Sequence, residues 1–120
     1  MDHTNAANFI LTLLHSATNA HLMHFQTKSF SMHKTLNEYY DEIVELADDY
    51  TEAYQGLYGV INEYANGYHP VEEPIKYFKA LKTFVETFRK ELPDRTSLQN
   101  IIDEIDALIL STIYKLENLQ

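Results

Sequence analysis

Three side chains that can bind a metal ion share one face of a predicted long helix: His33, Asp48 and Glu52. His21, twelve residues before His33, offers a further imidazole. Asp48 follows His33 by fifteen residues, so a continuous helix separates them by about 22 Å. One chain therefore cannot hold a single ion with both. Two copies of the helix packed antiparallel across a twofold axis can, which predicts a metal site shared within a dimer.

This face of the helix, here called the polar stripe, carries few compensating charges. It consists of His33, Asn37, Asp41, Val44, Asp48 and Glu52. Lys34 is the only Lys or Arg between Phe30 and Tyr64. Neighbouring acidic groups repel one another, so we expect a cation or a partner surface to meet the stripe. A merely hydrated acidic face is the alternative.

The ligand types narrow the choice of metal. Imidazole with carboxylate suits Fe²⁺, Zn²⁺ or Mn²⁺, and an oxygen-rich set favours iron or manganese. The sequence contains no Glu-x-x-His pair, which disfavours the usual di-iron centre inside a single bundle. It has no cysteine either, which excludes disulfides, thiolate metal sites and cysteine nucleophiles.

Charge and hydropathy limit the classes of partner. Eighteen acidic residues against nine basic give a net charge of −9, so we expect no direct binding to nucleic acid. The N-terminus lacks the pattern of a signal peptide, and the apolar run 9–14 is too short to span a bilayer. We therefore expect a cytoplasmic protein that does not enter a membrane.

Four helices are predicted from apolar residues that recur every three or four positions. They cover residues 5–26, 30–64, 75–92 and a segment that opens at 94 or 96 and continues through 116. The second helix is expected to bury Met32, Leu36, Tyr39, Ile43, Leu46, Tyr50, Ala53, Leu57 and Ile61. Only three glycines and three prolines occur, too few for a turn-rich β fold.

Local signals set the expected helix ends. Asn66-Gly67 is a stop signal for the second helix, although Gly56 and Gly59 weaken its last turns. Thr96 with Gln99 is expected to form a capping box at the start of the fourth helix.

The lengths of the connections predict the architecture. Thr27-Lys28-Ser29 is a short polar break, the break near Pro93 is also short, and residues 68–74 form the longest connection. Short breaks after the first and third helices imply two antiparallel hairpins joined by a crossover link. We therefore predict an all-α, ferritin-like four-helix bundle that forms one domain over residues 1–120.

Part of the chain resembles the ferroxidase segment of the Dps mini-ferritins. That family has a histidine, a second histidine twelve residues later, an acid four beyond it, and an Asp-x-x-x-Glu pair beginning fifteen after the second histidine. This chain matches every one of these spacings and four of the five residue types, through His21, His33, Asn37, Asp48 and Glu52. The resemblance covers residues 19–59, a third of the chain.

The resemblance implies a homo-oligomer built from dimers, a hollow dodecamer, that oxidises Fe²⁺ with peroxide or oxygen at its dimer interfaces. His21 and His33 of one subunit would bind the metal together with Asp48 and Glu52 of its mate. Asn37 departs from the family, because its neutral carbonyl stands where the family has an acid and weakens the affinity for a cation.

Other departures keep alternatives open. Leu22 stands at the position of a family tryptophan and Gln26 at that of a loop glycine. A shifted alignment with a three-residue deletion fits the loop better and makes His24 the alternative to His21 as a ligand.

Residues 24–56 also resemble small helical proteins of tailed phages, which would place the chain in a host cytoplasm. The alternative function is thus a non-enzymatic interaction or virion-associated protein that has lost the metal. A third alternative, an acidic mimic of nucleic acid, rests on charge alone.

Overall fold

The structure, a computed structural model, describes residues 1–65 and 73–119. All of its regular elements are helical: α1 (Thr4–Gln26), α2 (Phe30–Tyr58), α3 (Pro74–Phe88), the 3₁₀ turn η1 (Arg89–Glu91) and α4 (Thr96–Asn118). The predicted all-α architecture of four helices is confirmed. No helix in this part of the chain is long and apolar enough to cross a membrane.

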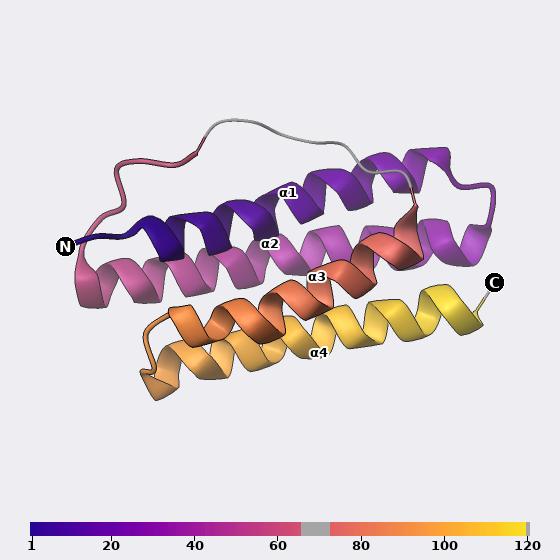
Figure 1. The fold of residues 1–120 in the computed structure, drawn as a ribbon. Coiled ribbons are helices and arrows are strands. Elements are labelled where there is room, and N and C mark those ends of the chain that lie inside the picture. Colours follow the sequence, from indigo (N-terminus) through magenta and orange to yellow (C-terminus); the bar gives the residue numbers. More distant parts are fainter. Residues whose placement is uncertain (66–72, 120) are drawn as a thin grey trace.

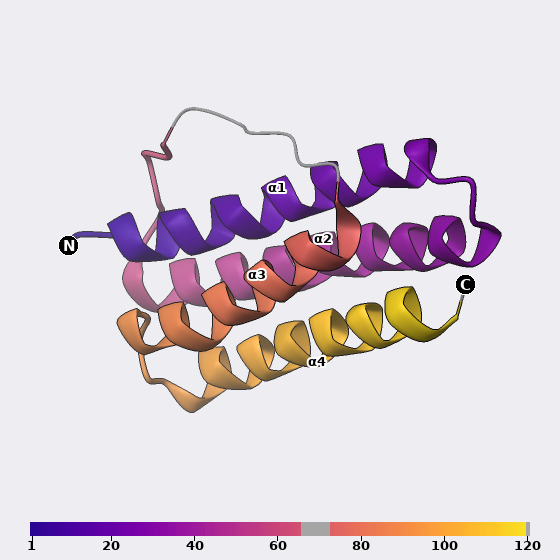
Figure 2. The same cartoon turned by 45° about the vertical axis from the view of Figure 1, so that its right-hand side comes forward.

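The helices form an elongated bundle of 46 × 28 × 21 Å. Figures 1 and 2 show α1 beside α2 and α3 beside α4, with opposite directions within each pair. α3 begins toward the end of the bundle where α1 ends, so α2 and α3 run the same way (Figure 1). α2 packs extensively against both α1 and α4, whereas α3 packs chiefly against α4.

The turn between α1 and α2 follows the predicted polar break. The backbone N–H of Thr27 donates to the carbonyl of Met23 and closes α1 (3.0 Å). Ser29 is the N-cap of α2, where its hydroxyl accepts from the backbone N–H of Met32 (3.3 Å). A short polar side chain at such a position replaces a hydrogen bond that the first helical turn cannot make. These caps bring α1 and α2 together within three residues.

The predicted end of α2 at residue 64 is wrong. The helix ends at Tyr58, and Gly59 caps it with φ = 100°. Glycine reaches this left-handed conformation without the Cβ clash that other residues meet, which allows the chain to leave the helix at this position. The side chain of Gln55 then accepts from the backbone N–H of Ile61 (2.9 Å). The expected stop at Asn66-Gly67 lies outside the described residues.

The capping box predicted at α4 is also wrong. Thr96 is the first helical residue, and the N-cap residue Arg95 makes no side-chain cap. Gln99 instead donates to the carbonyl of Pro93 (2.9 Å) and accepts from Nε of Arg89 (3.0 Å). The glutamine therefore links α4 to η1 and the residues that follow it. The local sequence pattern does not predict these tertiary contacts.

Tyr39 and Tyr50 of α2 are fully buried in the core, and they differ in the hydrogen bonding of their hydroxyls. Ser16 donates its proton to the carbonyl of Leu13, so the hydroxyl of Tyr39 donates to Ser16 (2.7 Å). The hydroxyl of Tyr50 has no hydrogen-bond partner among the described residues. Burial raises the pKa of both tyrosines, and the bond to Ser16 opposes this rise at Tyr39.

The prediction that α2 buries Leu57 is wrong. This residue is exposed, because it lies near the end of the helix.

We predict opposite effects for two tyrosine-to-phenylalanine substitutions. Tyr39→Phe removes a satisfied buried hydrogen bond and should lower the free energy of unfolding by about 1 kcal/mol. Tyr50→Phe removes a buried hydroxyl without a partner and should raise it by about 1 kcal/mol. Urea unfolding of both variants measures the difference, and equal losses would contradict the assignment.

The two described glycines provide a second matched pair. Gly59→Ala forces a Cβ into the left-handed region and should lower the free energy of unfolding by about 1–2 kcal/mol. Gly56 lies inside α2 with open space around its Cα, so Gly56→Ala should raise it by about 0.5–1 kcal/mol. Thermal unfolding distinguishes them, and stabilisation by Gly59→Ala would rule out this helix end.

Candidate functional site

The polar stripe lies along the solvent-facing side of α2. His33, Asp48 and Glu52 are exposed, while Asn37 is half-buried. Neither Asp48 nor Glu52 forms a hydrogen bond or ion pair with another described residue. The two carboxylates are therefore free to meet a cation or a partner from outside the chain.

His33 is oriented by a reciprocal contact with His24 across the α1–α2 turn. Nδ1 of His33 lies 3.0 Å from the carbonyl of His24, and Nδ1 of His24 lies 2.7 Å from the carbonyl of His33. The two rings stack with centroids 3.6 Å apart. A carbonyl only accepts, so Nδ1 of each ring carries the proton. In a neutral ring Nε2 is then unprotonated, the state in which imidazole ligates a metal.

The side chain of His21 belongs to a neighbouring polar network. Its ring stacks on Tyr40, with centroids 4.2 Å apart. The hydroxyl of Tyr40 donates to Oδ1 of Asn37 (2.5 Å), and the Asn37 amide donates to Asp41 (3.2 Å). The oxygen expected to replace a family carboxylate is thus already engaged within the chain. The network joins the histidines of α1 to the polar stripe of α2.

The predicted ligands divide into two groups along α2. His21, His24 and His33 gather at the α1–α2 turn, and the ring centroids of His21 and His24 are 6.0 Å apart. Asp48 lies about four helical turns beyond His33, and Glu52 about five. Within residues 1–65 and 73–119, no three His, Asp or Glu side chains of one chain are placed to hold a metal ion.

The structure distinguishes the surroundings of the two alternative histidines without testing either as a ligand. His21 is exposed on α1, whereas His24 is buried against His33. Sequence reasoning missed the reciprocal His24–His33 contact. The available signal was their placement on either side of the predicted turn, three residues before Thr27 and four after Ser29. Both assignments stay predictions.

The hydrogen bonds predict the tautomers of these rings. In their neutral forms His24 and His33 should carry the proton on Nδ1, because each Nδ1 faces a carbonyl. Long-range ¹H–¹⁵N NMR spectra of imidazole-labelled protein measure this directly. Peaks typical of Nε2–H at both positions would contradict the reciprocal contact. The peaks that are lost in His24→Phe would assign the ring of His24, and those lost in His33→Gln the ring of His33.

Comparison with known proteins identifies one family. The family of unknown function DUF5856 matches residues 24–116. The match includes His24, His33, Asp48 and Glu52 and excludes His21. No curated protein and no solved structure is significantly similar to the chain.

Proposed function

We propose that this chain, which belongs to the DUF5856 family of unknown function, binds Fe²⁺ at sites shared between two copies related by a twofold axis. The observation that carries the proposal is the orientation of His33. The residue is exposed, its Nδ1 is held by a backbone carbonyl, and its Nε2 is left as an acceptor. Metal-binding imidazoles typically donate their other ring N–H to a carbonyl or carboxylate in this way, which fixes the orientation of the ring.

The carboxylates supply the other half of the proposed site. Asp48 and Glu52 are exposed and unpaired on the same face of α2 as His33. In an antiparallel pair of α2 helices, the histidine of each copy faces the carboxylates of the other. Two acidic stripes would repel one another at such a contact, and a bound cation would relieve the repulsion. Metal binding and dimer formation should therefore strengthen each other.

The donor set fits iron, with zinc and manganese as alternatives. His33, Asp48 and Glu52 form the proposed ligand set, and His21 or His24 would add a second imidazole. Asn37 is a weak candidate because its oxygen already accepts from Tyr40. Iron would be the substrate, oxidised from Fe²⁺ to Fe³⁺ by oxygen or peroxide. The residues of this chain would bind the ion and hold it away from bulk water.

We further propose that the bundle is of the ferritin-like type, with a Dps-like arrangement of dimers. The helix directions support this: two antiparallel pairs, with α2 and α3 parallel to each other (Figure 1). The packing of the helices agrees with this arrangement. α2 packs against α1 and α4, and α3 packs against α4.

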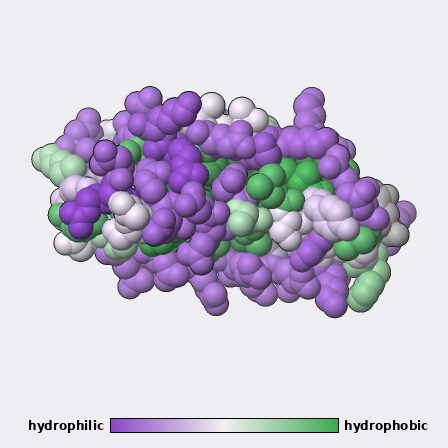
Figure 3. Space-filling model, turned by 90° about the horizontal axis from the view of Figure 1, so that it is seen from below, coloured by the Kyte–Doolittle hydropathy of each residue, from purple (hydrophilic) through white to green (hydrophobic). Residues whose placement is uncertain are grey.

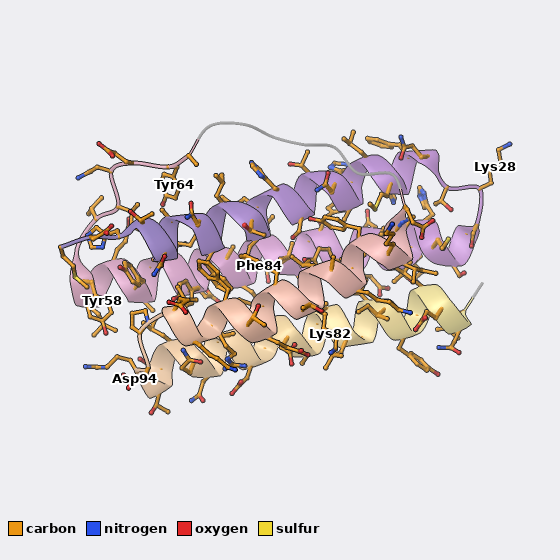
Figure 4. All side chains as sticks on the ribbon, viewed as in Figure 1. Lys28, Tyr58, Tyr64, Lys82, Phe84 and Asp94 are labelled. Atoms are coloured by element: carbon orange, nitrogen blue, oxygen red, sulfur yellow. The ribbon has the colours of Figure 1, made fainter. Side chains whose placement is uncertain are left out.

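Anaerobic titration with Fe²⁺ tests the proposal. His33→Gln, or Asp48→Asn together with Glu52→Gln, should weaken Fe²⁺ binding by roughly tenfold or more. The controls are His3→Gln for the histidine, and Glu63→Gln together with Asp94→Asn for the two carboxylates. They remove the same kinds of group outside the polar stripe, and Asp94 lies at the end of the bundle opposite to Lys28 (Figure 4). Calorimetry measures binding, and sedimentation velocity follows the metal-dependent dimer.

The outcomes separate binding from catalysis. Wild type and His33→Gln with equal Fe²⁺ affinity would overturn the shared site. Admission of air to the loaded protein then tests oxidation, since turnover produces ferric absorbance.

A non-enzymatic interaction protein is the second candidate. The observation that favours it is the engagement of Asn37, whose Oδ1 stands where the resembling family has a ligand carboxylate and already accepts from Tyr40 within the chain. Under this function the oligomeric state would be the same with Fe²⁺ and with a chelator.

A further inference from the structure

The end of the bundle at the α1–α2 turn presents large apolar side chains to solvent. Phe25 and Phe30 are 69% and 78% exposed on either side of the three-residue turn, and Leu22 is 40% exposed one turn earlier on α1. Single exposed apolar residues are common on protein surfaces. Two exposed phenylalanines on either side of one three-residue turn, with an exposed leucine one helical turn away, concentrate apolar surface at this end of the bundle, as contact surfaces do.

The same turn carries an unusual concentration of positive charge for this chain. Lys28 and Lys34 are the only Lys or Arg residues among residues 1–65. Neither forms an ion pair with another described residue. Lys28 projects outward from the end of the bundle (Figure 4). The hairpin tip, defined as Leu22, Phe25, Lys28, Phe30 and Lys34, is therefore both apolar and basic.

A groove with the complementary chemistry lies between α2 and α4. Its volume is about 680 Å³, and Leu46, Ala107 and Leu108 contribute apolar surface to it. Its carboxylates are those of Glu38, Glu42, Glu45, Asp49 and Glu104. Only Glu38 is compensated, by Lys115 at 3.2 Å; the other four have no partner among the described residues. We call this the acidic groove.

We propose that the hairpin tip of one copy docks in the acidic groove of a second copy. The phenylalanines would cover the apolar surface of the groove, and Lys28 and Lys34 would approach its unpaired carboxylates. A second copy is the occupant because this chain carries both complementary surfaces. Within one chain neither lysine reaches these carboxylates.

The size of the contact sets its strength. An aromatic side chain buries about 150–250 Å² when it is covered, so two phenylalanines with their partner surface stay near or below the roughly 1,200 Å² of stable interfaces. We therefore expect a weak association that depends on concentration and weakens with salt, because exposed charges are screened.

The surface on the side of α4 is mostly hydrophilic, with separate apolar patches (Figure 3).

This contact uses none of the proposed metal ligands and requires no ion, although the hairpin tip lies beside the histidines. The ring centroid of Phe25 is 4.9 Å from that of His21 and 5.5 Å from that of His24. The test of this contact is therefore performed with a chelator present, so that its failure would leave the iron proposal untouched.

The experiment is sedimentation velocity with complementary variants. The tip variant is Phe25→Ser with Phe30→Ser, and the groove variant is Glu45→Gln with Asp49→Asn. Each should weaken self-association by roughly tenfold or more. An equimolar mixture should associate again, because the intact tip of the groove variant still fits the intact groove of the tip variant. Far-UV circular dichroism verifies that these surface changes preserve the helices.

Matched controls isolate the two surfaces. Val60→Ser removes another exposed apolar side chain, and Glu63→Gln with Asp94→Asn removes the same charges outside the groove. Both controls should associate like wild type. A mixture of tip and groove variants that stays monomeric would overturn the proposal, as would self-association of the tip variant at wild-type strength. Binding of the tip to phosphatidylserine vesicles without self-association would overturn it in favour of a lipid surface.

Discussion

The burial of one face of α2 between α1 and α4 is the constraint on which the rest of the structure depends. Leu36, Tyr39, Ile43 and Tyr50 occupy this face at helical spacing, and all are fully buried. Once they face the core, the 3.6-residue period fixes the direction of every other α2 side chain. The polar stripe must then face solvent, and Glu42, Glu45 and Asp49 must line the side next to α4. The burial of this one face therefore determines where both the polar stripe and the α2 side of the acidic groove lie.

The helices could be predicted from sequence because apolar periodicity is a property of each segment by itself. The ends could be predicted only where the signal was local. Ser29 caps α2 through a residue three positions away, and the predicted break was correct. Gln99 failed as a capping residue because its partners, Pro93 and Arg89, belong to the preceding turn and helix. Gly59, which was expected only to weaken the last turns, ends α2 before the predicted stop at Asn66-Gly67, because its positive φ suits glycine.

The candidate site could likewise be predicted only where the signal lies within one helix. The spacing of His33, Asp48 and Glu52 placed them on one helix face, and all three are exposed. The partners of His33 and Asn37 could not be predicted, because they depend on how closely α1 approaches α2 at the turn. The acidic groove is formed by two helices that are not consecutive in sequence, so neither segment alone indicates it. Contacts within a helix follow from its period, whereas contacts between helices need the packed structure.

The early end of α2 also lengthens the connection to the following helix. α3 is about 22 Å long, and its first residue lies toward the end of the bundle opposite to Gly59 (Figure 1). Had α2 continued to residue 64, nine residues would remain for the return, reaching about 30 Å at full extension. Termination at Gly59 leaves fifteen residues, which reach about 50 Å. The end at Gly59 thus adds about 20 Å to the reach of the connection that returns to the start of α3.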